Sequence, residues 1–142
     1  MAINSSTEIG AKFAGKLKTA SNIRVLAFSG GEFNTPDWPK KNIHTDLEFA
    51  KTCGLKSRNV SGTQCMSYLT ELMIDIFGES WFDRGKMELK FVSMVDIGDN
   101  LVAKAVVTEK ELNSSKTKFT LDIECENHNG NKVVVGTATS WV

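Results

Sequence analysis

Between residues 63 and 77, apolar side chains recur at steps of three and four residues. The recurring positions are Met66, Leu69, Leu72, Met73, Ile76 and Phe77. This spacing places them on one face of an α-helix, and Cys65, Tyr68 and Ile74 widen the apolar surface beyond a single stripe. The pattern therefore predicts a long, mostly buried helix that ends at Gly78.

After this helix the pattern changes to the alternation that is typical of β-strands. The first such run places Met87, Leu89, Phe91 and Ser93 on one face. The predicted strands cover residues 86–95, 101–112, 116–126 and 132–142. Turns are predicted at residues 97–100, 113–115 and 127–131, and the last of these contains an Asn-Gly step, which favours positive backbone φ angles in hairpins.

The residues before the long helix give weaker signals for secondary structure. Residues 21–28 predict a short helix capped by Ser21 or Asn22. Alternation at Ile23, Val25 and Ala27 also fits a strand, so both alternatives stay open.

An irregular loop is predicted for residues 30–43, which contain both prolines of the chain. Thr45 is then the predicted N-cap of a second short helix, and Glu48 completes a capping box three residues later. This helix is expected to stop at Gly54.

One long helix followed by four antiparallel strands in hairpin order describes an α+β domain, to which the N-terminal segment can add a further strand. Because the helix is apolar on most sides, the sheet must wrap around it. Such an arrangement is a hot-dog fold, a curled antiparallel sheet around a long central helix. The length fits one domain, residues 1–142. Since a single layer leaves sheet edges exposed, we expect a dimer formed through an edge.

Composition argues against several classes of function. Seventeen basic and seventeen acidic residues cancel, which leaves no electrostatic footprint for nucleic acid or for an anionic membrane surface. No apolar run approaches the roughly 18–20 residues that span a bilayer, and residues 1–13 lack the pattern of a secretory signal. We therefore expect a cytoplasmic protein that binds neither nucleic acid nor membrane.

The three cysteines, Cys53, Cys65 and Cys125, have no CxxC spacing. They indicate neither a disulfide framework nor a structural zinc site, and no metal is expected. We expect small, partly buried thiols instead, because free cysteine is among the most buried residue types. Cys65 would serve as a nucleophile only if the fold placed a base beside it.

Candidate chemistry lies in residues 35–46, where Asp37 precedes His44 by seven residues. An imidazole titrates near neutral pH, so a histidine beside a carboxylate can take a proton from water. The loop can turn at Pro39, which allows both side chains to face one pocket. In the structural alternative, Asp37 forms an Asx turn and His44 contacts its own loop. The other histidine, His128, is expected to be a solvated turn residue.

Five short motifs along the chain match the sequence pattern of one protein family. They are Ser29-Gly30, Asn42-Ile43-His44-Thr45-Asp46, Glu48-Phe49-Ala50, Ile97-Gly98-Asp99 and Gly136-Thr137-Ala138. Together they resemble the MaoC-like hydratase/dehydratase family of hot-dog proteins, which includes the (R)-specific enoyl-CoA hydratases. The resemblance implies an acyl-CoA substrate and no cofactor apart from the coenzyme A of that substrate. It also implies a homodimer or a higher oligomer of dimers, or pairing with a second hot-dog subunit.

The resemblance assigns the catalytic pair to Asp37 and His44. Glu32 is a second candidate carboxylate, because residues 31–34 resemble the family's Gly-Asp-Phe-Asn. The spacing between Asp37 and His44 is two residues longer than the family's spacing. Lys40 and Lys41 would either attract the phosphates of coenzyme A or form an ordinary solvated charge pair.

At the start of the long helix, Val60-Ser61-Gly62 stands where the family has Ala-His-Gly, so the glycine remains and that histidine is absent. The resemblance implies that the backbone N–H of Gly62 holds the thioester oxygen as charge develops on it. Helix N-termini suit this role because their free N–H groups create positive potential. Ser61 would cap the helix or contact the substrate.

Three functions stay open at this point. The first is an enzyme that hydrates a 2-enoyl thioester or dehydrates a 3-hydroxyacyl thioester, with Asp37 and His44 activating water. The second is a hot-dog thioesterase, in which Glu32 or Asp37 directs water at the carbonyl. The third is a non-catalytic subunit paired with another hot-dog chain, which the longer spacing and the missing histidine favour. Five aromatic residues would line a pocket or belong to the core: Phe13, Phe33, Trp38, Trp81 and Phe82.

Overall fold

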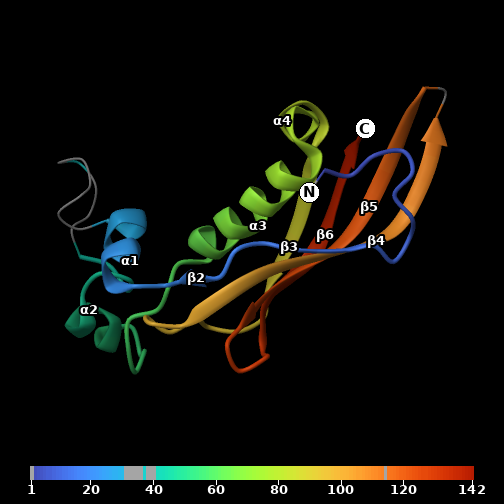
Figure 1. Cartoon of the computed structure of the whole chain (residues 1–142). Helices are drawn as coiled ribbons and strands as arrows, with labels where there is room; N and C mark the ends of the chain where they lie inside the picture. Colours follow the sequence, from blue (N-terminus) through green and yellow to red (C-terminus); the bar gives the residue numbers. More distant parts are fainter. Residues whose placement is uncertain (1, 31–36, 38–40, 114) are drawn as a thin grey trace.

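The protein folds around one curved antiparallel sheet (Figure 1). The computed structural model describes residues 2–30, 37, 41–113 and 115–142. The strands are β1 (Lys12–Ala14), β2 (Lys18–Thr19), β3 (Lys86–Phe91), β4 (Asn100–Asn113), β5 (Lys116–Asn127) and β6 (Lys132–Trp141). The helices are α1 (Asn22–Ser29), α2 (Leu47–Thr52), α3 (Gly62–Phe77) and α4 (Glu79–Arg84). The sheet order is β1-β4-β5-β6-β3, and β2 also pairs with β4. This is the hot-dog architecture that the sequence predicts.

Strands β4, β5 and β6 follow one another as antiparallel hairpins, as predicted. Strand β3 departs from the predicted hairpin order, because it pairs with β6 and not with β4. Residues 92–99 therefore cross one end of the sheet before β4 begins. This crossing connection contacts the chain that enters α3, since the Val60 N–H donates to the Val95 carbonyl at 2.9 Å.

Helix α3 lies across one face of the sheet, and its buried side chains form the core together with those of β4, β5 and β6. The buried apolar residues of this helix repeat at intervals of three or four: Cys65, Leu69, Leu72, Met73, Ile76 and Phe77. The predicted helix and its end at Gly78, where φ is 59°, are confirmed. The prediction that α3 is buried on most sides is wrong for one side, where Met66 is 38 % exposed. The sheet of a single chain covers only one face of this helix.

The two short helices before α3 decide between helix and strand for residues 21–28 and test the N-cap predicted at Thr45. Helix α1 confirms the predicted helix over the alternative strand, with Ser21 as its N-cap residue. The capping box predicted at Thr45 is wrong. Asp46 is the N-cap of α2, and its carboxylate accepts the Phe49 N–H at 2.8 Å. The Thr45 hydroxyl does not cap α2, because it accepts the Asn42 N–H at 3.0 Å in the preceding turn.

The region after α3 contains a helix that the sequence pattern does not predict. Helix α4 begins directly after Gly78 and stacks Trp81 on Phe77, with ring centroids 6.2 Å apart. Strand β3 ends at Phe91, so Ser93 lies outside the strand and is exposed. Within the residues that the structure describes, no helix has both the length and the apolar character needed to cross a bilayer.

Candidate functional site

The N-terminal end of α3 points toward α1 and α2, beyond one end of the sheet (Figure 1). The chain entering this helix is fixed by an isolated antiparallel bridge between Asn59 and Asp96. Ser61 is the N-cap, and its Oγ accepts the Gln64 N–H at 3.3 Å. Gly62 is the first helical residue, and its N–H has no acceptor in the described part of the chain. This N–H is therefore available to an anionic or carbonyl oxygen at the positive end of the helix.

Asn42 connects the turn that carries His44 to the end of α1. Its Nδ2 donates to the Ser29 carbonyl at 2.8 Å, and its Oδ1 accepts the His44 N–H at 2.8 Å. The second bond makes an Asx turn. The Asn42 carbonyl also accepts the N–H groups of Thr45 at 3.1 Å and Asp46 at 3.0 Å. These bonds make residues 42–46 a compact turn whose position is set by α1.

The imidazole of His44 is tied to the entry of α3. Its Nδ1 lies 2.7 Å from the Asn59 carbonyl oxygen. A carbonyl oxygen can only accept a hydrogen bond, so the neutral ring donates from Nδ1 and carries its free lone pair on Nε2. Because Asn59 lies three residues before Gly62, this bond brings the ring to the N-terminal end of α3. The ring can therefore accept a proton only through Nε2.

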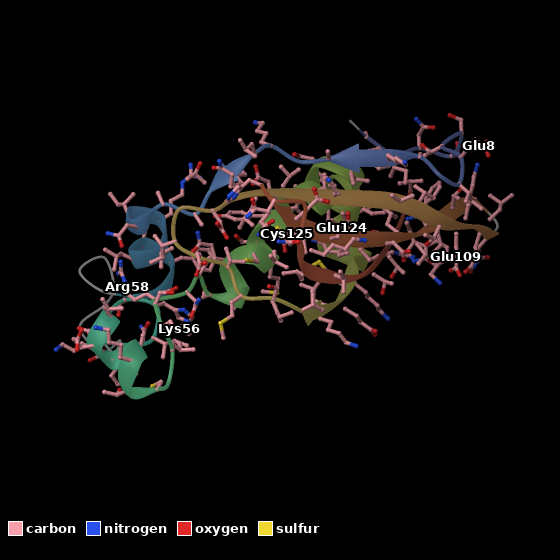
Figure 2. All side chains as sticks on the ribbon, turned by 90° about the horizontal axis from the view of Figure 1, so that it is seen from below. Glu8, Lys56, Arg58, Glu109, Glu124 and Cys125 are labelled. Atoms are coloured by element: carbon pink, nitrogen blue, oxygen red, sulfur yellow. The ribbon has the colours of Figure 1, made fainter. Side chains whose placement is uncertain are left out.

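Arg58 braces the same end of the molecule (Figure 2). Its Nη1 donates to the Thr45 carbonyl at 3.2 Å, and its Nη2 donates to Asn22 Oδ1 at 2.6 Å. In Figure 2, Arg58 lies at the end that carries α1 and α2, whereas Glu8 and Glu109 mark the opposite end. A single guanidinium thus holds α1, the Asn42–Asp46 turn and the chain before α3 in fixed relative positions.

Gly62 is packed against the ring of Phe91, the last residue of β3. A Cβ built at Gly62 would lie 2.8 Å from Phe91 Cε1, which is closer than two carbon atoms normally approach. Glycine is therefore the residue that allows this close packing. Phe91 is 53 % exposed, so part of its ring remains accessible beside the helix end.

Three of the four predicted site residues meet at this end of the molecule. His44, Ser61 and Gly62 are joined through the bond from His44 to Asn59. Asp37 is exposed, and within the described residues no hydrogen bond or ion pair joins it to His44. The role of Asp37 stays a prediction.

The remaining charged candidates are Glu32, Lys40, Lys41 and His128. Glu32 and Lys40 lie outside the described residues. The Lys41 ammonium is 3.8 Å from the Asp46 carboxylate, and its side chain is 75 % exposed. His128 is exposed in its turn, as predicted, with Nδ1 3.7 Å from the Asp99 carboxylate.

The predicted aromatic residues divide between core and surface. Phe13 and Trp81 pack against the core, and Phe82 is 74 % exposed on α4. Phe33 and Trp38 lie outside the described residues. Among the described residues, the ring of Phe91 borders the candidate site. The strand pattern had placed Phe91 on one face together with Met87 and Leu89.

The cysteines offer no reactive group to this site. Cys53 is exposed, whereas Cys65 and Cys125 are buried. Burial raises the pKa of the Cys65 thiol to about 11. Burial, with a smaller contribution from Cys65, raises the pKa of Cys125 to about 12. Since the thiolate is the nucleophile, the buried pair is inert near neutral pH. Across the described residues, no group of three His, Cys, Asp or Glu side chains is placed to hold a metal ion.

Three residues of this site are absent from the sequence-based prediction. Asn42 had a recognisable signal, because an asparagine two residues before His44 is typical of an Asx turn. Asn59 contributes a backbone carbonyl, which any residue type can supply, so the sequence carries no signal for it. Arg58 is recognised only once the fold brings its partners within reach.

The arrangement supplies the elements of acid–base chemistry on a carbonyl compound. A histidine whose Nδ1 is hydrogen-bonded lies beside a helix end whose first N–H group has no acceptor among the described residues. Such a pair can remove a proton from water and stabilise negative charge on a thioester oxygen.

Comparisons with known proteins identify the fold. One solved structure that matches is a monoamine oxidase regulatory protein from Archaeoglobus, with a TM-score of 0.77 and 23 % sequence identity. The match covers 96 % of this chain and 91 % of that chain. The (R)-hydratase PhaJ1 from Pseudomonas aeruginosa matches with 20 % identity, coverage of 96 % and 82 %, and a TM-score of 0.75. An (R)-hydratase from A. caviae matches with 24 % identity, coverage of 96 % and 98 %, and a TM-score of 0.72.

Complexes of two different hot-dog subunits also match, among them the HadBC complex from Mycobacterium tuberculosis. Its TM-score is 0.68 at 14 % sequence identity, and the match covers 96 % of this chain and 98 % of that chain. A search of curated protein sequences finds no significant match. A profile of the MaoC-like domain matches residues 37–128, about two thirds of the chain. The profile therefore includes the turn at His44, the entry to α3 and all of α3. On this evidence the chain belongs to the MaoC-like hydratase/dehydratase family.

Proposed function

We propose that this protein catalyses the reversible hydration of a 2-enoyl-CoA thioester to a 3-hydroxyacyl-CoA thioester. The observation that carries the proposal is the bond from His44 Nδ1 to the Asn59 carbonyl, 2.7 Å long. It leaves the Nε2 lone pair as the only basic site of the ring. It also holds the ring at the end of α3, where a thioester oxygen would bind.

In this mechanism the bound water loses a proton to His44 Nε2 as its oxygen bonds to C3 of the enoyl group. The electron pair of the C2–C3 double bond shifts toward C2 and the thioester carbonyl, which becomes enolate-like. C2 then takes up a proton from the Asp37–His44 pair, so the site returns to its starting state. Water is thereby added across the double bond, with the hydroxyl group on C3 and the hydrogen on C2.

The negative charge that develops on the thioester oxygen requires a donor. The Gly62 N–H supplies it, because no acceptor among the described residues occupies it and the helix end adds positive potential. Ser61 keeps the first turn of the helix in place, since its Oγ accepts the Gln64 N–H. Asp37 is the proposed carboxylate partner of His44, with Glu32 as the alternative.

The names of the matching structures support the reaction type, although their low identities establish only the fold. Two are (R)-hydratases, and HadBC is named as a 3R-hydroxyacyl-ACP dehydratase. A carrier-protein thioester is therefore the second substrate to test.

We also propose a homodimer formed through β3, an edge strand of the sheet. Its last residue, Phe91, and the following Val92 and Met94 are apolar and exposed. The alternative assembly pairs this chain with a second hot-dog subunit, as in HadBC. Light scattering on the purified chain would measure the mass. A monomer at working concentration contradicts the homodimer.

The test is a hydration assay with crotonyl-CoA, followed by the loss of absorbance of the conjugated thioester. His44→Ala should lower kcat by roughly 10²- to 10⁴-fold, the range that general acid–base catalysis usually contributes. His128→Ala is the matched control, because it removes the only other histidine from an exposed turn. The control should keep the full rate.

Three results would contradict the proposal. An unchanged rate in His44→Ala would remove this residue from the mechanism. Release of free coenzyme A, detected with a thiol reagent, would indicate a thioesterase. Absence of both activities across acyl groups and both carriers would indicate a non-catalytic subunit.

A further inference from the structure

Strand β3 forms one edge of the sheet and carries charges that no described residue pairs with (Figure 1). Lys86, Glu88 and Lys90 are exposed, and their side chains form no ion pair or hydrogen bond with a described residue. They alternate with Met87 and Leu89, which pack against the core, so they lie on the outer face of the sheet. The residues opposite these charges on β6 are uncharged: Thr139, Thr137 and Val135. Charges of opposite sign can approach them from the open side of β3.

The backbone of β3 also has hydrogen-bonding groups on this open side. The Val92 N–H donates to the Val133 carbonyl at 3.0 Å, which continues the pairing of β3 with β6 by one residue. The residues of an antiparallel strand bond alternately to its two sides. This bond therefore directs the N–H and C=O groups of Met87, Leu89 and Phe91 to the open edge. Such an edge is a template for pairing with a strand of another chain.

The inner face of β3 leads to the candidate site. Phe91 follows Met87 and Leu89 at the same two-residue spacing, so its ring lies on their face of the sheet. There it packs against Gly62, where an added Cβ would lie 2.8 Å from the ring, and it remains 53 % exposed. A strand added at the open edge would therefore lie beside a ring that borders the site.

A second copy of this chain can supply that strand through a two-fold axis. In such an interface the same surface is used by both copies, and β3 pairs antiparallel with β3 of the partner. Residues that lie directly opposite each other share a face of the sheet. Apolar and charged positions therefore stay on their own faces only if the axis passes through one residue, which then lies opposite its own copy.

A centre at Leu89 gives the charges partners. Glu88 of each chain then lies opposite Lys90 of the partner subunit, and the symmetry makes this pair twice. On the inner face, Phe91 of each chain lies opposite Met87 of the partner subunit. The backbone groups that face the open edge belong to these same inner residues, so they meet their counterparts across the axis.

The other centres do not combine these pairs. A centre at Glu88 sets two glutamates against each other and Lys86 against Lys90 of the partner subunit. A centre at Lys86 or Lys90 sets that lysine against its own copy. Like charges directly opposite each other are destabilising. A centre at Met87 or Phe91 leaves half of β3 or more beyond the end of the partner's strand.

We propose that two copies pair through β3 with Leu89 opposite Leu89 of the partner subunit, and that Met87 of the partner subunit completes each candidate site. Side chains directly opposite each other have Cβ atoms about 4.5–5.5 Å apart. The partner's Met87 therefore covers the exposed part of the Phe91 ring, beside Gly62. The pairing is independent of any activity, whereas the completion of the site rests on the proposed function and deepens it.

Charge reversal tests the register of this pairing. Glu88→Lys sets lysines against lysines at both symmetric positions, and Lys90→Glu sets glutamates against glutamates. Because two attractive pairs become repulsive in each variant, the dissociation constant of the dimer should rise roughly 10- to 100-fold in sedimentation measurements. An equimolar mixture of the two variants should pair as tightly as the wild type, since each lysine then lies opposite a glutamate. Lys12→Glu, exposed on the edge strand β1, is the matched control and should leave the dissociation constant unchanged.

The same variants test whether the partner completes the site. Measurements are made at a concentration where the wild type is dimeric and the single variants are monomeric, with folding checked by circular dichroism. The monomers should bind a saturated acyl-CoA roughly tenfold more weakly in calorimetry and hydrate crotonyl-CoA with roughly tenfold lower kcat/KM, because the thioester loses one wall of its site. Mixing the two variants should restore both values.

The outcomes separate the register, the completed site and the proposed function. Unchanged dimer affinity in both single variants overturns the register, and tighter pairing of Lys90→Glu alone indicates a centre at Glu88 instead. A wild type that is monomeric and pairs only with a different chain overturns the second copy as partner. Monomeric variants with wild-type acyl-CoA affinity overturn the role of the partner's Met87. Charge-dependent pairing with acyl-CoA binding and no hydration contradicts the proposed function alone.

Discussion

Asn42→Ala tests whether the turn around His44 is positioned by its link to α1. The change removes two side-chain hydrogen bonds, one to the Ser29 carbonyl and one from the His44 N–H, each 2.8 Å long. At about 0.5–1.5 kcal/mol for each bond, the free energy of unfolding should fall by about 1–3 kcal/mol. For a domain of this size that corresponds to a decrease in Tm of roughly 3–10 °C. Because the imidazole then loses its fixed position, kcat should fall by roughly 10- to 100-fold.

The assay combines thermal unfolding by circular dichroism with crotonyl-CoA hydration. The control is Asn4→Ala, which removes an Asx turn in which Asn4 Oδ1 accepts the Ser6 N–H at 2.9 Å. This turn adjoins Ile3, whose N–H donates to the Ile76 carbonyl at the other end of α3. The control should lower stability slightly and leave kcat unchanged.

A conservative variant at the same position adds a second readout. Asn42→Asp keeps the acceptor for the His44 N–H and loses the donor to the Ser29 carbonyl, so its kcat should lie closer to the wild type than that of Asn42→Ala. If Asn42→Ala loses stability but keeps its kcat and its pH–rate profile, Asn42 does not position His44 for catalysis. That result would refute the reasoning.

Two further predictions concern the packing of Gly62 and the pH dependence of stability. Gly62→Ala places a Cβ 2.8 Å from the Phe91 ring, so it should lower both kcat/KM and stability. Its stability cost, measured by urea unfolding, should shrink by about 1 kcal/mol in a Phe91→Ala background; equal costs in both backgrounds would mean that the ring does not limit this site. The raised pKa of Cys65 means that below about pH 9 both the folded and the unfolded state keep the thiol proton, whereas between about pH 9 and pH 11 only the unfolded state loses it. Stability should therefore fall across that window, less steeply in Cys65→Ser, and identical slopes for the two proteins would contradict the assignment.

Local sequence signals predicted several elements well, because each of them depends on neighbouring residues. The three- and four-residue spacing located α3 to within one residue at its start, and Gly78 ended it. Alternation located β4, β5 and β6, and the Asn-Gly step located the last hairpin, where Gly130 has a φ of 78°. Helical spacing, strand alternation and turn residues are read within a few positions of one another.

The prediction of the N-cap of α2 failed because two neighbouring residues compete for the same role. Thr45 and Asp46 are both good caps, and the sequence alone favoured Thr45. The fold selects Asp46, because Asn42 uses the Thr45 hydroxyl in the preceding turn. The choice therefore depended on a contact across the turn that no capping motif describes.

The sequence by itself determined the α+β class, the central helix, the three consecutive hairpin strands and the family to which the chain belongs. Only the tertiary structure decided the place of β3 beside β6 and the bond between His44 and Asn59. The physical reason is the range of the interactions. Helices, turns and strand faces follow from residues a few positions apart, whereas the orientation of an imidazole depends on a backbone carbonyl fifteen residues away, and any residue type can supply that carbonyl.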